Sequence, residues 1–366
     1  MFLYEIIPAT LKFAFPAGTS RGILTEKPTW FLKLWDDASP DCIGWGEAGL
    51  LQGLSPENQE TFFDDLTQFL ETVLPHLDTK PRAWENLSSR WMESTNAPWL
   101  PSAFFALETA WLDWVNGGKR LICAPEFHAG LWSVPLNGLV WMNPRATMEQ
   151  QARQKVGEGF ETLKLKVGAL DWHQELDMLA ALRSEFPAKT LSLRLDANGA
   201  WTPTEAQAKL GQLAEFDVEF IEQPISPGQE RALAELCQVS PIPIALDEEL
   251  IGKPLDHQKF SLLEVVQPQA IVLKPTLLGG LGQTHQWVKM AEDQGILWWI
   301  TSMLESNLGL NSIAQLAAQY RPVLPQGLGT GKIYTNNIPS PLQVIQGEMH
   351  YLNKGAWDFS SINFSR

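Results

Sequence analysis

The sequence predicts an α/β protein built as a (β/α) barrel, a modified TIM barrel, with an α+β capping domain formed by the N-terminal part and the C-terminal tail. After residue 134, short apolar strand-like segments alternate with amphipathic helix-like segments, which is typical of repeated βα units. Charged residues end five of these segments, at positions 166, 196, 222, 247 and 274. The steps between them are 25 to 30 residues, about the length of one βα unit.

The N-terminal part, residues 1–125, has a different pattern, in which strands precede helices. Three antiparallel strands are expected in "LYEIIPATLKFAF", "WFLKLWD" and "CIGWGEAGL". Two helices are expected between Pro56 and Trp91, and a third from Pro101 to Gly117, where proline starts the segment and glycine stops it. This pattern predicts a capping domain.

The barrel is expected over residues 126–334, and the tail, residues 335–366, is expected to form strands that rejoin the capping domain. Helices such as "TPTEAQAKLGQLAEF" separate the strands. Eight strands favour a closed barrel over an open doubly wound sheet. The predicted strands are "VPLNGLV", "TLKLKV", "LSLRLDA", "VEFIEQP", "IPIALDE", "AIVLKP", "ILWWITS" and "PQGLGT".

Composition limits the partners. The formal net charge of −15 argues against attachment to nucleic acid or to an anionic membrane surface, and favours a small-molecule partner. Cys42, Cys123 and Cys237 form no CxxC pair, so neither a disulfide framework nor a thiolate zinc site is expected. No basic leader and no apolar run of about 18 residues is present, so we expect a cytoplasmic protein. No sequence feature decides the oligomeric state.

The charged strand ends predict a metal site. The carboxyl ends of barrel strands meet at one mouth, so Asp196, Glu222 and Asp247 should lie together there. Three carboxylates at short range need a cation, and an all-oxygen set favours Mg2+, with Mn2+ as a substitute, over zinc. Lys164 and Lys166 share one face of their strand. In dry, cationic surroundings a lysine has a lowered pKa and can act as a base.

Each of these residues also has an ordinary explanation when it is taken alone. Lys164 and Lys166 suit an exposed edge strand, Asp196 with Asn198 suits a helix-capping turn, and Glu222 suits a solvated loop. The joint spacing of all five charged strand ends is what favours a site.

The order KxK, DxN, EQP, DE and then Lys274 followed by Gly279 and Gly280 resembles the enolase superfamily, in the branch that holds muconate cycloisomerases and o-succinylbenzoate synthases. The resemblance implies that a base removes the proton α to a carboxylate and that a metal ion stabilises the enediolate. Lys166 would be the base, Lys274 the opposing lysine, and Lys164 an electrostatic support. The implied Mg2+ ligands are Asp196, Glu222 and Asp247.

Within this branch, "SMLESNLGLNSIAQLAA" and "GLGTGKIYTNN" are most similar to the o-succinylbenzoate synthases of menaquinone (vitamin K2) biosynthesis. The implied reaction is a Mg2+-dependent syn dehydration of 2-succinyl-6-hydroxy-2,4-cyclohexadiene-1-carboxylate to 2-succinylbenzoate. The loop Ala17 to Ile23 would close over the site, with Arg21 near an anionic group. The other implied substrate-binding residues are Asn198, Ser302, Glu305, Ser306, Gly329 and Thr330.

Other functions remain as alternatives. A dipeptide epimerase of this branch carries an Asp-x-Asp pair at the last strand, whereas "PQGLGTGKIY" has no acid. An N-succinylamino acid racemase uses the same paired lysines and stays open. The segment around Ser302 disfavours a muconate cycloisomerase, and acid-sugar dehydratases have a histidine where Ser302 stands. A catalytically silent carboxylate-binding barrel would be expected to have lost one of the five charges.

Overall fold

Three long N-terminal strands form an antiparallel sheet in the computed structural model, which describes residues 1–19, 22–78, 83–360 and 362. They are β1 (Phe2–Thr19), β2 (Gly22–Asp36) and β3 (Ser39–Gly49), in the order β1–β2–β3. On β2, Leu32 and Leu34 are fully buried, two residues apart as the strand period requires. The three predicted strands are therefore confirmed.

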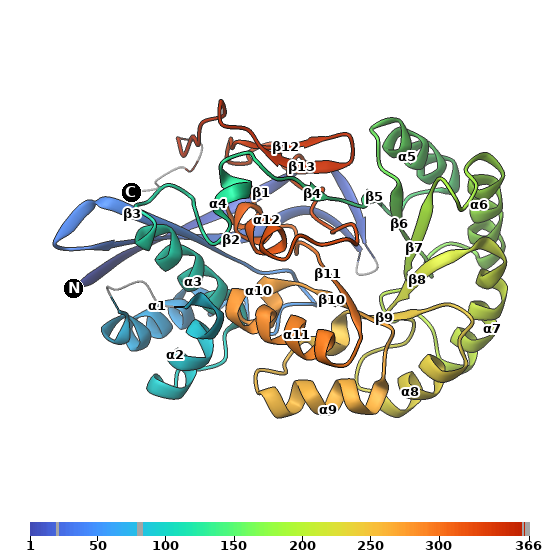
Figure 1. The fold of residues 1–366 in the computed structure, drawn as a ribbon, viewed down its shortest axis with the longest axis horizontal. Helices are drawn as coiled ribbons and strands as arrows, with labels where there is room; N and C mark the ends of the chain where they lie inside the picture. Colours follow the sequence, from blue (N-terminus) through green and yellow to red (C-terminus); the bar gives the residue numbers. More distant parts are fainter. Residues whose placement is uncertain (20–21, 79–82, 361, 363–366) are drawn as a thin grey trace.

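Helices gather beside this sheet (Figure 1). The most buried is α3 (Pro101–Val115), which packs on β3. It begins at a proline, whose missing N–H costs nothing in the first turn, and Gly117 follows its end with a φ of 80°. The other elements of this part are α1 (Phe62–Val73), η1 (Leu74–His76), η2 (Trp84–Asn86), α2 (Leu87–Thr95) and α4 (Pro125–His128).

Seven parallel strands form the second sheet, in the order β11–β10–β9–β8–β7–β6–β5. Each neighbour in this order is also the neighbour in sequence, as right-handed βα repeats produce. The strands are β5 (Gly138–Val140), β6 (Thr162–Lys166), β7 (Ser192–Asp196), β8 (Val218–Glu222), β9 (Ile244–Leu246), β10 (Ala270–Leu273) and β11 (Leu297–Ile300).

Helices cover the outside of these strands, most plainly α5 to α9 in Figure 1. Their apolar residues enter the same core that fills the capping domain. The elements are α5 (Arg145–Gly157), α6 (Trp172–Glu185), α7 (Pro203–Leu213), η3 (Ala214–Phe216), α8 (Glu230–Val239), η4 (Glu248–Leu250), α9 (Asp256–Val266), α10 (Pro275–Leu278), α11 (Leu281–Asp293) and α12 (Asn307–Gln319). No helix among the described residues has both the length and the apolarity to cross a membrane.

The barrel is closed by two residues instead of the eighth strand predicted in "PQGLGT". Gln326 donates its N–H to Pro135 O (2.7 Å), and Gly327 donates its N–H to Ile300 O (2.8 Å). The segment therefore bridges residues next to the two edge strands, Leu136 before β5 and Thr301 after β11, without forming a strand. Pro325 lacks an N–H to donate, and glycine is a poor strand residue, so pairing extends no further.

The tail forms β12 (Leu342–Ile345) and β13 (Glu348–Tyr351), and β13 pairs with β4 (Val134–Pro135) at the start of the barrel. The predicted strands are present, but they do not pair with the capping sheet. The tail contacts that sheet on both sides of this hairpin: Thr335 donates its N–H to Lys12 O of β1 at 2.9 Å, and the Phe359 ring stacks on Trp45 with ring centroids 4.4 Å apart. The division at 1–125, 126–334 and 335–366 stays a prediction.

The close contact between β3 and α3 gives a first testable prediction. A Cβ at Gly46 would lie 2.0 Å from Ala106 O, so Gly46→Ala must push backbone away from backbone. We expect a loss of about 1–3 kcal/mol in the free energy of unfolding, measured by urea denaturation. Gly211→Ala in α7 is the control, because nothing lies within 4 Å of its Cβ and alanine favours a helix by about 0.5–1 kcal/mol. Equal effects at the two sites would contradict this packing.

A buried lysine of the outer helices gives a second prediction. Lys259 of α9 is fully buried and donates to Gln283 Oε1 (2.5 Å) and Gln286 Oε1 (2.6 Å) of α11. Burial lowers its pKa from 10.5 to about 8. Between these two values the unfolded chain binds the proton that the folded chain has released, so stability should rise with pH across that window, by up to about 3 kcal/mol. Urea unfolding of Lys259→Met should lack this rise, and a parallel pH dependence in the variant would refute the assignment.

Candidate active site

The charged residues of the barrel lie at neighbouring strand ends. Lys166 pairs in register with Asp196, and Asp196 pairs in register with Glu222, so three adjacent strands carry them at the same height. Asp247 directly follows β9, and Lys274 directly follows β10. Parallel strands in register are what bring these distant sequence positions to one mouth.

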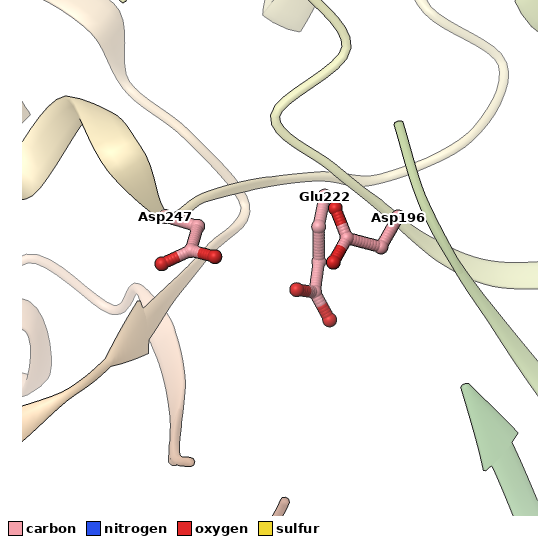
Figure 2. A group of neighbouring side chains, drawn as sticks. All are labelled: Asp196, Glu222 and Asp247. Atoms are coloured by element: carbon pink, nitrogen blue, oxygen red, sulfur yellow. The ribbon is translucent and has the colours of Figure 1, made fainter. Parts of the chain in front are cut away.

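Three carboxylates form a group that can hold a metal ion. Asp196, Glu222 and Asp247 each offer an oxygen, and these oxygens lie within 4.8 Å of one another. Figure 2 shows the three side chains turned toward a common space, with Asp247 facing the other two. All three are buried, and Glu222 Oε1 has no hydrogen-bond partner among the described residues. A buried carboxylate oxygen without a donor fits a cation ligand, and an oxygen-only set fits a hard divalent ion.

Three lysines surround these carboxylates. Lys164 Nζ lies 2.9 Å from Asp196 Oδ2 and also donates to Glu222. Lys166 Nζ lies 3.1 Å from Asp196 Oδ2, and Lys274 pairs with Asp247. In the sheet order, β6 and β10 stand on opposite sides of the three strands that lead to the acids. Lys166 and Lys274 therefore flank the carboxylate group from its two sides.

Burial and charge oppose each other in this group. Burial raises the pKa of Glu222 to about 7, although Lys164 lowers it, and burial likewise raises the pKa of Asp247. For Asp196 burial also acts upward, but Lys164 and Lys166 outweigh it and the pKa is lowered. For Glu222 and Asp247, burial therefore disfavours the ionised form, and a nearby cation would offset this effect.

Lys164 and Lys274 show the reverse of the lowered pKa that was expected for lysines in this site. Burial lowers the pKa of Lys164, but Asp196 and Glu222 outweigh it, so the net pKa is raised. The pKa of Lys274 is raised for the same reason, with Asp247 as the main opposing charge. The predicted lowering needs a further positive charge among the acids.

Asn198 orients Lys166. Its Oδ1 accepts from Lys166 Nζ at 2.5 Å, and its Nδ2 donates to Glu248 Oε1 at 3.0 Å. Asn198 has a φ of 45°, a left-handed conformation that asparagine tolerates better than most residues. The DxN motif therefore supplies a carboxylate and a turn that aims an amide at the lysine.

Gln223 links two of the acidic motifs. Its Oε1 accepts the backbone N–H groups of Asp247 and Glu249, both at 3.2 Å, and its Nε2 donates to Ile225 O at 3.0 Å. Gln223 is fully buried, with a φ of 37°. The glutamine of EQP therefore fixes the backbone that carries the carboxylate of Asp247.

A cavity opens beside these groups. Of the predicted substrate-binding residues, it is lined by Asn198, Ser302, Gly329 and Thr330. Glu305 and Ser306 are fully buried and do not line it: Thr276 Oγ1 donates to Glu305, and Ser306 donates to Glu47. Arg21 lies outside the described residues.

Sequence reasoning missed much of the cavity wall. Leu139 lies in β5, with Asn137 just before it and Trp141 just after it, where alternation could have indicated an inward face. The others lie in β1 or β2, in the loop after β3, after β11 or in the segment that closes the barrel, and follow no period that predicts their contacts. They are Thr19, Leu24, Leu51, Gln52, Leu54, Thr301, Met303, Leu304 and Gly327.

Known proteins match this chain over most of its length. The family model described as Enolase C-terminal domain-like matches residues 147–354. An o-succinylbenzoate synthase from Desulfotalea psychrophila is 42% identical over 356 residues, which are 92% of this chain and 95% of the relative. One from Escherichia fergusonii is 30% identical, covering 79% of each chain.

Solved structures are similar to this chain over nearly its whole length. The crystal structure of MenC from Desulfotalea psychrophila has a TM-score of 0.81 at 38% identity, covering 95% of this chain and 99% of that one. The L-Ala-D/L-Glu epimerase from Bacillus subtilis also has a TM-score of 0.81, at 20% identity, covering 97% of this chain and 96% of that one. At that identity the second likeness shows the fold alone, which is the predicted barrel with a capping domain.

The acidic group gives a third prediction. A divalent cation bound by Asp196, Glu222 and Asp247 should raise the thermal midpoint, since a ligand at 100 times its Kd adds about 2.7 kcal/mol to the folded state. We expect this rise with Mg2+ or Mn2+, reversal by EDTA, and its loss in Glu222→Gln. Glu219→Gln is the control, because Glu219 is on the same strand and pairs with Arg194. An equal rise in wild type and Glu222→Gln would place the cation elsewhere.

Proposed function

This chain belongs to the enolase superfamily, and on that premise we propose that it is an o-succinylbenzoate synthase. The reaction is the syn dehydration of 2-succinyl-6-hydroxy-2,4-cyclohexadiene-1-carboxylate to 2-succinylbenzoate, a lyase reaction of menaquinone biosynthesis. Its partner is thus a small-molecule carboxylate, and we place the reaction in the cytoplasm. The similarity to o-succinylbenzoate synthases over most of the chain supports this choice within the superfamily.

The observation that carries the proposal is the placement of two lysines on opposite sides of three carboxylates. Lys166 and Lys274 both line the cavity, and the strands between them lead to Asp196, Glu222 and Asp247. A substrate carboxylate placed against this group has a base within reach of its α carbon and a second ammonium on the other side. This is the arrangement that proton abstraction next to a carboxylate requires.

We propose Mg2+ as the ion held by Asp196, Glu222 and Asp247, with Mn2+ as a substitute. The unpartnered Glu222 Oε1 and the oxygen-only ligand set support a hard cation. When bound, the ion supplies positive charge that stabilises the second negative charge of the enediolate.

Lys166 carries the proton in both halves of the reaction. Its neutral amine takes the α proton, and the electrons of that C–H bond move into the enediolate. The C–O bond of the ring hydroxyl then breaks on the same face, the resulting ammonium returns its proton to the departing oxygen, and water leaves. The electron pair held in the enediolate forms the last double bond of the aromatic ring. Lys166 is then a neutral amine again, as it was at the start. Lys274 remains an ammonium and stabilises the dianionic intermediate.

The far wall of the cavity suits the substrate's polar groups. Ser302 Oγ and Thr330 Oγ1 lie 2.8 Å apart and face the cavity from the ends of two adjacent segments, with Gly329 beside them. Hydroxyls and glycine N–H groups bind a carboxylate without adding charge. We assign this wall to a substrate carboxylate.

The wall also bears on the competing activities. No acid stands between Gly327 and Gly331, so an epimerase substrate's ammonium finds no carboxylate there. Racemisation of an N-succinylamino acid is favoured by one observation, the two lysines on opposite sides, since one can remove and the other return a proton. It is the second candidate.

The fourth prediction tests the reaction and its base. With Mg2+, the wild type should aromatise the cyclohexadiene carboxylate, followed by ultraviolet absorbance, and EDTA should abolish the turnover. Lys166→Ala should lower kcat by at least about 10³-fold, because the base that moves the proton is gone.

Two controls keep the result specific. Lys155→Ala removes a half-buried lysine paired with Glu158 and should leave turnover unchanged, and Lys166→Ala should keep its metal-induced thermal shift. Wild type that binds metal but turns over nothing would refute the synthase. A library of N-succinylamino acids in D2O would then test the racemase by deuterium exchange at the α carbon.

A further inference from the structure

A buried lysine of the capping domain reaches into the barrel. Lys27 is on β2, has no exposed surface, and donates from Nζ to Leu304 O at 2.9 Å. Leu304 lies in the loop between β11 and α12, and its side chain lines the cavity beside the metal group. Burying a charged side chain costs folding free energy. A buried lysine is therefore expected to make a contact that the structure or the function needs.

Leu304 is held in an unfavourable backbone conformation. Its φ is 59°, in the left-handed region that leucine rarely adopts. A second donor meets the same carbonyl, since Tyr334 Oη lies 2.6 Å from Leu304 O. The conformation therefore persists because two buried donors converge on one peptide.

This peptide is connected to the polar wall of the cavity. Leu304 donates its N–H to Ser302 Oγ at 3.3 Å, and Ser302 Oγ pairs with Thr330 Oγ1. Displacing Leu304 would free the Ser302 hydroxyl to rotate. Lys27 is thus linked to Ser302 in the cavity wall through one residue, Leu304, whose carbonyl accepts from Lys27 and whose N–H donates to Ser302.

Two carboxylates near Lys27 hold the rest of the loop. Glu305 accepts from Met303 N (2.8 Å), and Glu47 of β3 accepts from Ser306 N (2.8 Å) and Gly309 N (2.9 Å), at the start of α12. Burial lowers the pKa of Lys27, while the charges of Glu305 and Glu47 act in the opposite direction. Lys27 and the two acids thus form one buried cluster that joins β2 and β3 to the loop before α12.

We propose that Lys27 is a positioning residue that fixes the Leu304 peptide and so sets how tightly the cavity binds substrate. Lys27 is not among the residues that line the cavity, and its Nζ donates to a backbone carbonyl and not to Asp196, Glu222 or Asp247. The inference rests on the proposed function for its kinetic consequence, but the contact itself can be tested without turnover.

The first test measures the loop directly. In Lys27→Met, amide hydrogen exchange of peptides covering residues 302–306 should accelerate at least about tenfold, since the strained peptide loses a holding contact. Lys259→Met is the matched control, an equally buried lysine on α9 that should leave these peptides unchanged. If Lys27→Met does not fold, Tyr334→Phe, which removes the other donor, should give the same acceleration. Unchanged exchange in the folded variant would overturn the proposal.

The second test separates positioning from general damage. Lys27→Met should raise KM about tenfold and change kcat less than about threefold, because the wall moves while the lysines and acids stay. Its metal-induced thermal shift should match wild type, and Lys259→Met should keep the wild-type KM. An unchanged KM, or kcat and metal binding falling together, would overturn the proposal. Wild type without turnover would instead refute the synthase, and the exchange experiment would still decide the role of Lys27.

Discussion

Three carboxylates within 4.8 Å of one another in a buried mouth are stable only when positive charge lies among them. The other residues of the barrel mouth place positive charge beside these carboxylates and hold it there. Register between β6, β7 and β8 puts Lys166, Asp196 and Glu222 at one height, and Asn198 and Gln223 adopt left-handed backbone conformations to hold the lysine and the next acidic loop. These strained turns cost folding energy at the same place where catalysis needs fixed charges.

The capping domain helps to build the site. Besides Lys27 and Glu47, Glu108 of α3 accepts the N–H groups of Leu281 and Gly282, where α11 begins a few residues after Lys274. Gly280 has a φ of 100°, a conformation that favours glycine, and a Cβ there would lie 2.2 Å from Glu108 Oε2. Buried acids from the capping domain thus meet the N-termini of α11 and α12, where unpaired N–H groups favour negative charge.

The sequence predicts features that follow a period and misses those that depend on tertiary contact. Strand ends recur with the βα unit, so the five charged positions could be identified, whereas the predicted strand "PQGLGT" is only a two-residue bridge, limited by Pro325 and Gly327. Glu305 and Ser306 were expected at the substrate because they follow Ser302, but the left-handed turn at Leu304 directs them into the core. The raised pKa values of Lys164 and Lys274 were missed because they depend on tertiary contacts between each ammonium and the carboxylates.

The number of contacts also distinguishes the two lysines of β6. Lys164 contacts the carboxylates of both Asp196 and Glu222, so removing its proton would leave two buried acids without that partner. Lys166 contacts one carboxylate and the neutral amide of Asn198, which can accept from an ammonium or donate to an amine after rotation. In a low-dielectric site the loss of one ion pair costs less than the loss of two. Within the proposed mechanism, this difference supports Lys164 as the permanent charge and Lys166 as the residue that moves the proton.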